Sequence, residues 1–299
     1  MDYEANYGKY AVPSMLTQLV ELQSQMKHPH GHLLHLYFGL DDVTSRYFMT
    51  PVDGIGFARP GADGIHYCFL TDFGVAASLE DAYIVRVSPM DFGDPVRIVA
   101  RNLKEFLRLL CFRPVAADLL DTRVSREQYE RWNEEYPGWE GTRDDISREA
   151  ARRVIERFSL EPVGDDLYSY YQELGRERAA AVVAATKDSI GVVPVRQGAT
   201  ADEAGGPLEA GDHVDWAEVR ERFPRLSMER RLAWIRDMQS LGAFYNHDEG
   251  RAWTQAQLAE AGFADEAVRI AYPERPKPQP RQQAWATLRL SWKSTKSQS

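Results

Sequence analysis

The sequence predicts an α+β protein, with a mixed or antiparallel sheet and packed helices, followed by a mostly helical C-terminal region. Short runs rich in Ile, Val, Tyr and Phe, separated by glycine and proline turns, fill residues 46–99. Helical spacing of Leu and Phe begins directly after them, and capping signals and apolar spacing beyond residue 120 are mostly helical. Strands followed by helices are typical of α+β architectures.

The first expected element is a helix from Pro13 to Met26. Proline is well placed in a first helical turn, where its missing N–H costs nothing. The apolar stripe of this helix is expected to comprise Met15, Leu19, Leu22 and Met26.

Beyond residue 46 the sequence predicts three strands and one shorter extended segment. Turns are expected at residues 51–54 and 60–64, because Pro, Asp and Gly concentrate there. The extended segments are residues 56–58, 65–70, 82–87 and 96–99.

A closing helix is expected after the last strand. Leu103, Phe106, Leu107 and Leu110 recur at helical spacing, and Asn102 is the residue type that caps a helix N-terminus.

The C-terminal region is expected to be helical with one break. Capping signals begin at Ser125 and Thr142, and a third helix is expected from Asp166 to Lys187. Residues 197–212 are rich in Gly, Ala and acids and are typical of a flexible linker. Later helices are expected over residues 214–223, 228–241 and 254–262.

These signals divide the chain into residues 1–120, 121–272 and a Pro-rich basic tail at 273–299. Residues 1–120 carry 14 acidic and 10 basic side chains, residues 121–272 carry 30 and 20, and the tail carries 1 and 6. Residues 285–292 of the tail are a candidate edge strand. The acidic body disfavours nucleic acid as a partner, because phosphates bind Lys and Arg, and suits a basic protein partner.

Composition favours a cytoplasmic protein without a membrane span. The start of the chain lacks the basic and apolar pattern of a signal peptide, and no run of about 18 apolar residues occurs. Cys68 and Cys111 are the only cysteines, and both have apolar neighbours. Two buried thiols are the expected state in a reducing compartment.

Residues 8–120 resemble the SUKH superfamily, which includes yeast glucan-synthesis regulators and many bacterial toxin-immunity proteins. The resemblance rests on order and spacing: a turn with the pattern FA…G.DG before a hairpin, then a strand, then a closing helix. In this sequence the matching segments are 50–51, 56–58, 61–70, 82–89 and 96–107.

The resemblance implies a mixed sheet with helices around it, and binding to other proteins without shared catalytic residues. Bacterial members look like proteins that neutralise toxins, often nucleases. We therefore expect a non-enzymatic binding protein without a cofactor, with a basic toxin domain as its partner; the oligomeric state stays open. Acidic complementarity would steer that partner, and the candidate contacts are Asp41, Asp42, Asp63, Asp72, Glu80 and Asp81.

Two alternatives remain from the residues themselves. His28, His30, His32 and His35 lie close together, and imidazole binds zinc, so a metal-dependent hydrolase is one of them. Their spacing lacks the helical His-Glu-x-x-His pattern, and the sequence contains no Gly-x-Ser-x-Gly elbow or Gly-Lys-Ser/Thr loop. A regulatory scaffold that docks through its helical half is the other alternative.

Metal removal separates the hydrolase from the binding protein. We expect untagged, chelator-treated protein to remain folded, as circular dichroism would show, with no stoichiometric metal by elemental analysis. Stoichiometric metal whose removal unfolds the protein would favour the hydrolase.

Overall fold

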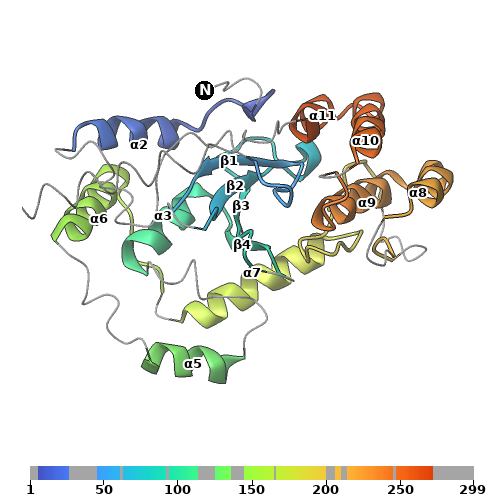
Figure 1. The fold of residues 1–299 in the computed structure, drawn as a ribbon. Coiled ribbons are helices and arrows are strands. Elements are labelled where there is room, and N and C mark those ends of the chain that lie inside the picture. Colours follow the sequence, from blue (N-terminus) through green and yellow to red (C-terminus); the bar gives the residue numbers. More distant parts are fainter. Residues whose placement is uncertain are drawn as a thin grey trace, which may run out of the picture.

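The computed structural model describes residues 6–26, 46–60, 63–91, 94–113, 125–135, 145–164, 166–199, 206–209, 214–244 and 247–271. Its centre is a four-stranded antiparallel sheet in the order β1-β2-β3-β4 (Figure 1). The strands are β1 (Gly54–Ala58), β2 (His66–Leu70), β3 (Tyr83–Val87) and β4 (Val96–Ala100). The α+β prediction is confirmed, and the described sheet is antiparallel throughout.

Both faces of the sheet are buried, and the alternation of strand side chains explains how. On β2, Tyr67 and Phe69 point into one hydrophobic cluster, whereas Cys68 and Leu70 point into another. The second cluster includes Met49 and continues to Ile190, which lies more than 100 residues further along the chain. The strand residues are therefore mostly apolar on both faces, with Arg86 and Arg97 as the charged exceptions.

Three helices cover the face that carries Tyr67 and Phe69. They are α2 (Ser14–Ser24), α3 (Leu103–Phe112) and α6 (Asp145–Phe158), which lie on one side of the sheet in Figure 1. Phe106 of α3 packs against Phe57 and Tyr67, with ring centroids 6.1 Å and 4.6 Å away. The expected stripe of α2 is buried at Leu19, Leu22 and Met26, while Met15 is half-buried.

Two capping predictions are confirmed. The Asn102 side chain accepts a hydrogen bond from the Glu105 backbone N–H at 2.9 Å. Ser125 and Gln128 form a reciprocal capping box at the start of α5 (Arg126–Glu135), since each side chain accepts from the other's backbone N–H.

Helix α7 (Leu167–Ala181) ends before Lys187, so the predicted C-terminus of the third helix is wrong. Val182 is already extended, and Ala184 pairs with Val192 in an isolated antiparallel bridge. Gly191 has a φ of +69°, which favours glycine. Polar side chains stabilise this loop in place of another helical turn.

Four helices lie on the other side of the sheet (Figure 1). They are α8 (Trp216–Arg222), α9 (Met228–Ser240), α10 (Asp248–Glu260) and α11 (Ala264–Ala271), with a 3-10 turn, η3 (Phe223–Arg225), after α8. Helix α10 begins earlier than expected, and α11 was not predicted. Their core contains Val52 and Phe73, which precede β1 and follow β2.

The boundary at residue 120 stays a prediction, but two observations bear on the organisation around it. One hydrophobic cluster contains Leu107 and Val154, which come from either side of that boundary. Within the expected linker, Leu208 is buried, and its backbone N–H donates to Asp237 Oδ2 at 2.6 Å. The tail, residues 273–299, lies outside the described residues.

Replacing Asn102 with Ala should lower the free energy of unfolding by about 1 kcal/mol, because the Glu105 N–H loses its side-chain acceptor. Asn102→Asp keeps an acceptor and is the matched control. Urea denaturation of the three proteins measures the difference. Equal stability of wild type and Asn102→Ala would contradict a stabilising cap.

Candidate functional site

Several predicted site residues fall outside the described part of the chain. Asp41 and Asp42 are among them, as are the four histidines of the loop, His28, His30, His32 and His35. Their roles stay predictions. Within the described ranges, no three His, Cys, Asp or Glu side chains are grouped as a metal site requires.

Asp72 is not an exposed loop residue, which corrects the expectation of a surface contact there. It lies in the 3-10 turn η2 (Asp72–Gly74) and is buried. Both of its carboxylate oxygens accept hydrogen bonds from the guanidinium of Arg178, at 2.8 and 2.7 Å. Arg178 also donates to the carbonyl oxygens of Ile190 and Gly191. The pair joins η2 to α7 and the loop that follows α7, a structural role.

Asp63 is exposed, and the length of β2 separates it from Glu80 and Asp81, the other exposed candidates that the structure describes. It precedes β2, whereas Glu80 and Asp81 follow that strand, so they lie toward opposite ends of it. Asp63 and Gly64 both have positive φ, 53° and 72°, as the predicted tight turn requires. The structure therefore does not bring all of the predicted acidic contacts together.

Glu80 and Asp81 lie together on one exposed surface. The N-terminal segment runs alongside their loop, because Tyr10 Oη donates to the carbonyl of Ala76 at 3.0 Å and Ser14 N–H donates to Glu80 Oε1 at 3.0 Å. The side chains of Val12 and Val75 on these two segments are 38% and 48% exposed. We call these four exposed residues of the two adjoining segments, Val12, Val75, Glu80 and Asp81, the acidic valine face; the Lys9 ammonium lies beside Gly74, next to Val75.

A buried charged cluster, which the sequence did not reveal, connects the sheet to the C-terminal helices. Arg236 of α9 has no exposed surface, and its Nε lies 3.4 Å from both Asp53 Oδ1 and Asp188 Oδ2. Asp53 directly precedes β1, and Asp188 lies in the loop after α7. Arg236 Nη1 donates to the Gly191 carbonyl at 2.7 Å. Three distant segments thus meet at one guanidinium.

Burial and the neighbouring charges together set the pKa values in this cluster. Desolvation raises the pKa of Asp53 to about 6, against the opposing effect of Arg236. Burial alone would lower the pKa of Arg236, but the carboxylates of Asp188, Asp53 and Asp72 outweigh it, so that pKa is raised. The cation is therefore held charged, and its role is to neutralise carboxylates.

Two further buried groups near this cluster, the Cys68 thiol and the His66 imidazole, are uncharged at neutral pH. Burial raises the pKa of the Cys68 thiol to about 12, so it is protonated at neutral pH. Burial lowers the pKa of His66 to about 4, and its ring nitrogens lie 3.0 Å from Thr50 Oγ1 and 2.9 Å from the Gly64 carbonyl oxygen. Both cysteines are free and buried.

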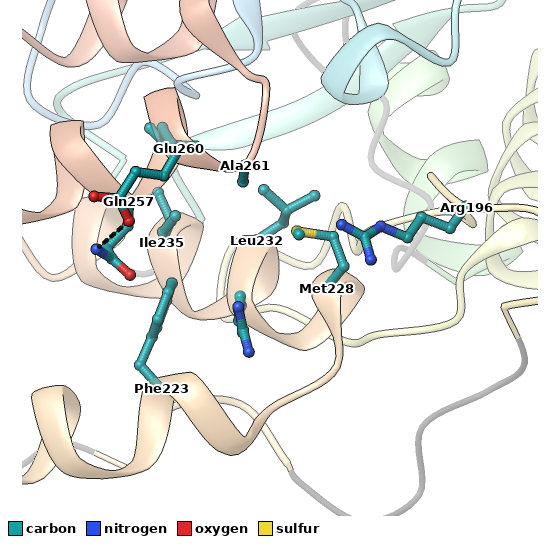
Figure 2. Close-up of a pocket in the computed structure, with 10 residues that line it drawn as sticks. Arg196, Phe223, Met228, Leu232, Ile235, Gln257, Glu260 and Ala261 are labelled. Carbon is teal, nitrogen blue, oxygen red and sulfur yellow. Dashed lines mark hydrogen bonds between the residues drawn. The ribbon is translucent and has the colours of Figure 1, made fainter.

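A cavity of about 290 Å³ lies among the C-terminal helices (Figure 2). Its floor is apolar, and Figure 2 shows Gln257 and Glu260 at one side and Arg196 at the other. Arg231 also lines it, but two of its nitrogens donate to the carbonyls of Leu226 and Pro224. The described lining residues include no hydroxyl, thiol or imidazole, so they offer no side-chain nucleophile of those kinds.

Comparison with known proteins adds no relationship. No protein-family model matches the chain, and its sequence has no significant match among curated proteins. The resemblance to the SUKH superfamily therefore stays a prediction. Among the described residues, no helix combines the length and apolarity that crossing a bilayer requires.

Asp53→Asn should flatten the pH dependence of stability between about pH 4 and 6. The pKa of Asp53 is raised to about 6 in the folded protein, so the folded state binds this proton more tightly than the unfolded chain. The carboxyl therefore contributes stability that is fully present below about pH 4 and is lost as the pH rises through about 6.

The unfolding free energy of wild type, relative to Asp53→Asn, should consequently fall by roughly 3 kcal/mol across that window. Urea denaturation at several fixed pH values measures it. Parallel pH profiles for the two proteins would contradict a raised pKa at Asp53.

Proposed function

We propose that this chain is a non-enzymatic protein-binding protein that acts in the bacterial cytoplasm and neutralises a toxin by occluding it, as SUKH-type immunity proteins do. The observation that carries the proposal is the acidic valine face. Exposed valines beside carboxylates suit a partner surface that combines apolar contacts with basic side chains. The two buried, free thiols fit a reducing compartment.

The fate of the buried charges supports binding over catalysis. Asp72 is bonded to Arg178, and Asp53 and Asp188 flank Arg236. These groups neutralise one another inside the protein. A catalytic group must instead reach a substrate, whereas Glu80 and Asp81 are exposed carboxylates that can meet a partner.

The geometry narrows the candidate contacts. Glu80 also accepts a hydrogen bond from the backbone N–H of Ser14 at the start of α2, so changing it would disturb the fold as well as the surface. Within the described part of the chain, the Asp81 side chain accepts one hydrogen bond, from the half-buried Ser78 hydroxyl. Asp81 and Val75 are therefore the cleaner positions for a test.

Asp81→Lys and Val75→Lys should each weaken toxin binding by about tenfold or more, because a cation would face a basic partner. Asp63→Lys is the matched control, since it makes the same charge change near the other end of β2 and should leave affinity nearly unchanged. The probe is the purified product of the gene directly upstream, titrated by calorimetry with each variant.

Growth of cells that co-express the upstream gene with each variant gives a second readout. Wild type and Asp63→Lys should protect the cells, and Asp81→Lys should protect them less. Failure of wild type to bind or to protect would contradict the immunity function. Equal losses at Asp63 and Asp81 would contradict the acidic valine face as the contact surface.

A further inference from the structure

The two outer strands of the sheet, β1 and β4, differ in whether side chains bond to their outward backbone groups. The edge of β1 is closed by side chains: Asn6 Nδ2 donates to the Gly56 carbonyl at 2.9 Å, and Arg46 Nη1 donates to the Gly54 carbonyl at 2.7 Å. Bonding an outer carbonyl in this way prevents another strand from pairing there. On β4, the described part of the chain supplies no such closure.

The pairing register shows which β4 groups face outward. Ser88 N–H donates to the Pro95 carbonyl, which makes 88 and 95 a hydrogen-bonded pair. Such pairs alternate along an antiparallel ladder. The backbone N–H and C=O of Arg97 therefore bond to the backbone of Arg86 on β3, while those of Val96 and Ile98 point away from β3. No described backbone group bonds to Val96 or Ile98 outside the sheet.

A groove of about 380 Å³ runs along this open edge. Val96 and Ile98 line it on one side, and α7 lines the other with Gly175 and Ala179, whose small side chains leave space. Ile190 continues the apolar floor below β4. An open row of backbone groups beside an apolar groove is the arrangement that accepts an added strand.

We propose that residues 285–292 of this chain add to the open edge of β4 as a fifth strand. Leu288, Leu290 and Trp292 recur with a period of two, so in an extended conformation they share one face. That face would meet the apolar floor at Val96, Ile98 and Ile190. Arg289 and Ser291 would face the other way.

The charge of the tail and the length of the chain that leads to it both allow residues 285–292 to reach the β4 edge. Residues 1–272 carry 44 acidic and 30 basic side chains, whereas residues 273–299 carry 1 and 6, so the body attracts the tail. The chain from Ala271 to Trp285 spans up to about 45 Å when extended. The three strand spacings from β1 to β4 take only about 15 Å. Helix α11 lies toward the β1 side, where Arg269 Nε donates to the Val52 carbonyl at 3.0 Å.

Amide hydrogen exchange, followed by NMR on the full chain, tests the proposal. The variant Leu288→Pro with Leu290→Pro removes donors and blocks pairing of the tail. Exchange at Val96 and Ile98 should be about tenfold or more faster in this variant than in wild type, while Arg97, which bonds to β3, stays unchanged. Gln282→Pro with Gln283→Pro is the matched control and should behave as wild type.

Three results would overturn the proposal. Equal exchange at Val96 and Ile98 in wild type and in the Leu288→Pro, Leu290→Pro variant is the first. Loss of protection on dilution of wild type is the second, because it would assign the edge to another copy of the chain. The third is a loss of protection in the Gln282→Pro, Gln283→Pro control as large as in the test variant. None of these outcomes depends on whether the protein binds a toxin.

Discussion

Arg236 has no exposed surface, and its guanidinium lies between the carboxylates of Asp53 and Asp188. Asp53 belongs to the sheet region, Asp188 to the loop after α7, and Arg236 to the C-terminal helices. A buried ion pair gains little net stability, because desolvation offsets the Coulomb attraction. Its consequence is geometric, since any other docking of α9 would separate the Arg236 guanidinium from the buried carboxylates of Asp53 and Asp188.

The same constraint fixes the neighbouring elements. Arg178 holds Asp72 and two loop carbonyls, and Arg269 holds Glu266 and the Val52 carbonyl. Each of these arginines bonds to a segment more than 100 residues away in the chain. The carboxylates of Asp72 and Glu266 are thereby hydrogen-bonded inside the protein. The acidic valine face, in contrast, lies on the exposed surface.

The two outer edges of the sheet differ in their local chemistry. Asn6 and Arg46 close the edge of β1 by bonding its outward carbonyls. The edge of β4 instead borders a groove lined by small residues of α7. The strand proposed for this edge, residues 285–292, belongs to the basic tail of the same chain.

The sequence by itself determined the local elements. The four strands, the cap at Asn102 and the box at Ser125 follow from alternation, helical spacing and short-range side-chain bonds, all of which act within a few residues. It also identified Glu80 and Asp81 as acidic loop residues. What it could not determine was exposure, which is why Asp72 was placed on the surface although Arg178 buries it.

Only the tertiary structure decided which charged side chains, distant in the sequence, lie next to one another. Asp53, Asp188 and Arg236 carry no spacing that links them, because their proximity results from packing between segments up to 183 positions apart. The early end of α7 also results from tertiary contacts. Arg178 donates to the carbonyl of Gly191, whose positive φ suits a loop, and the neighbouring elements stabilise that loop. Burial of charge is a property of the assembled core, and no local pattern in the sequence encodes it.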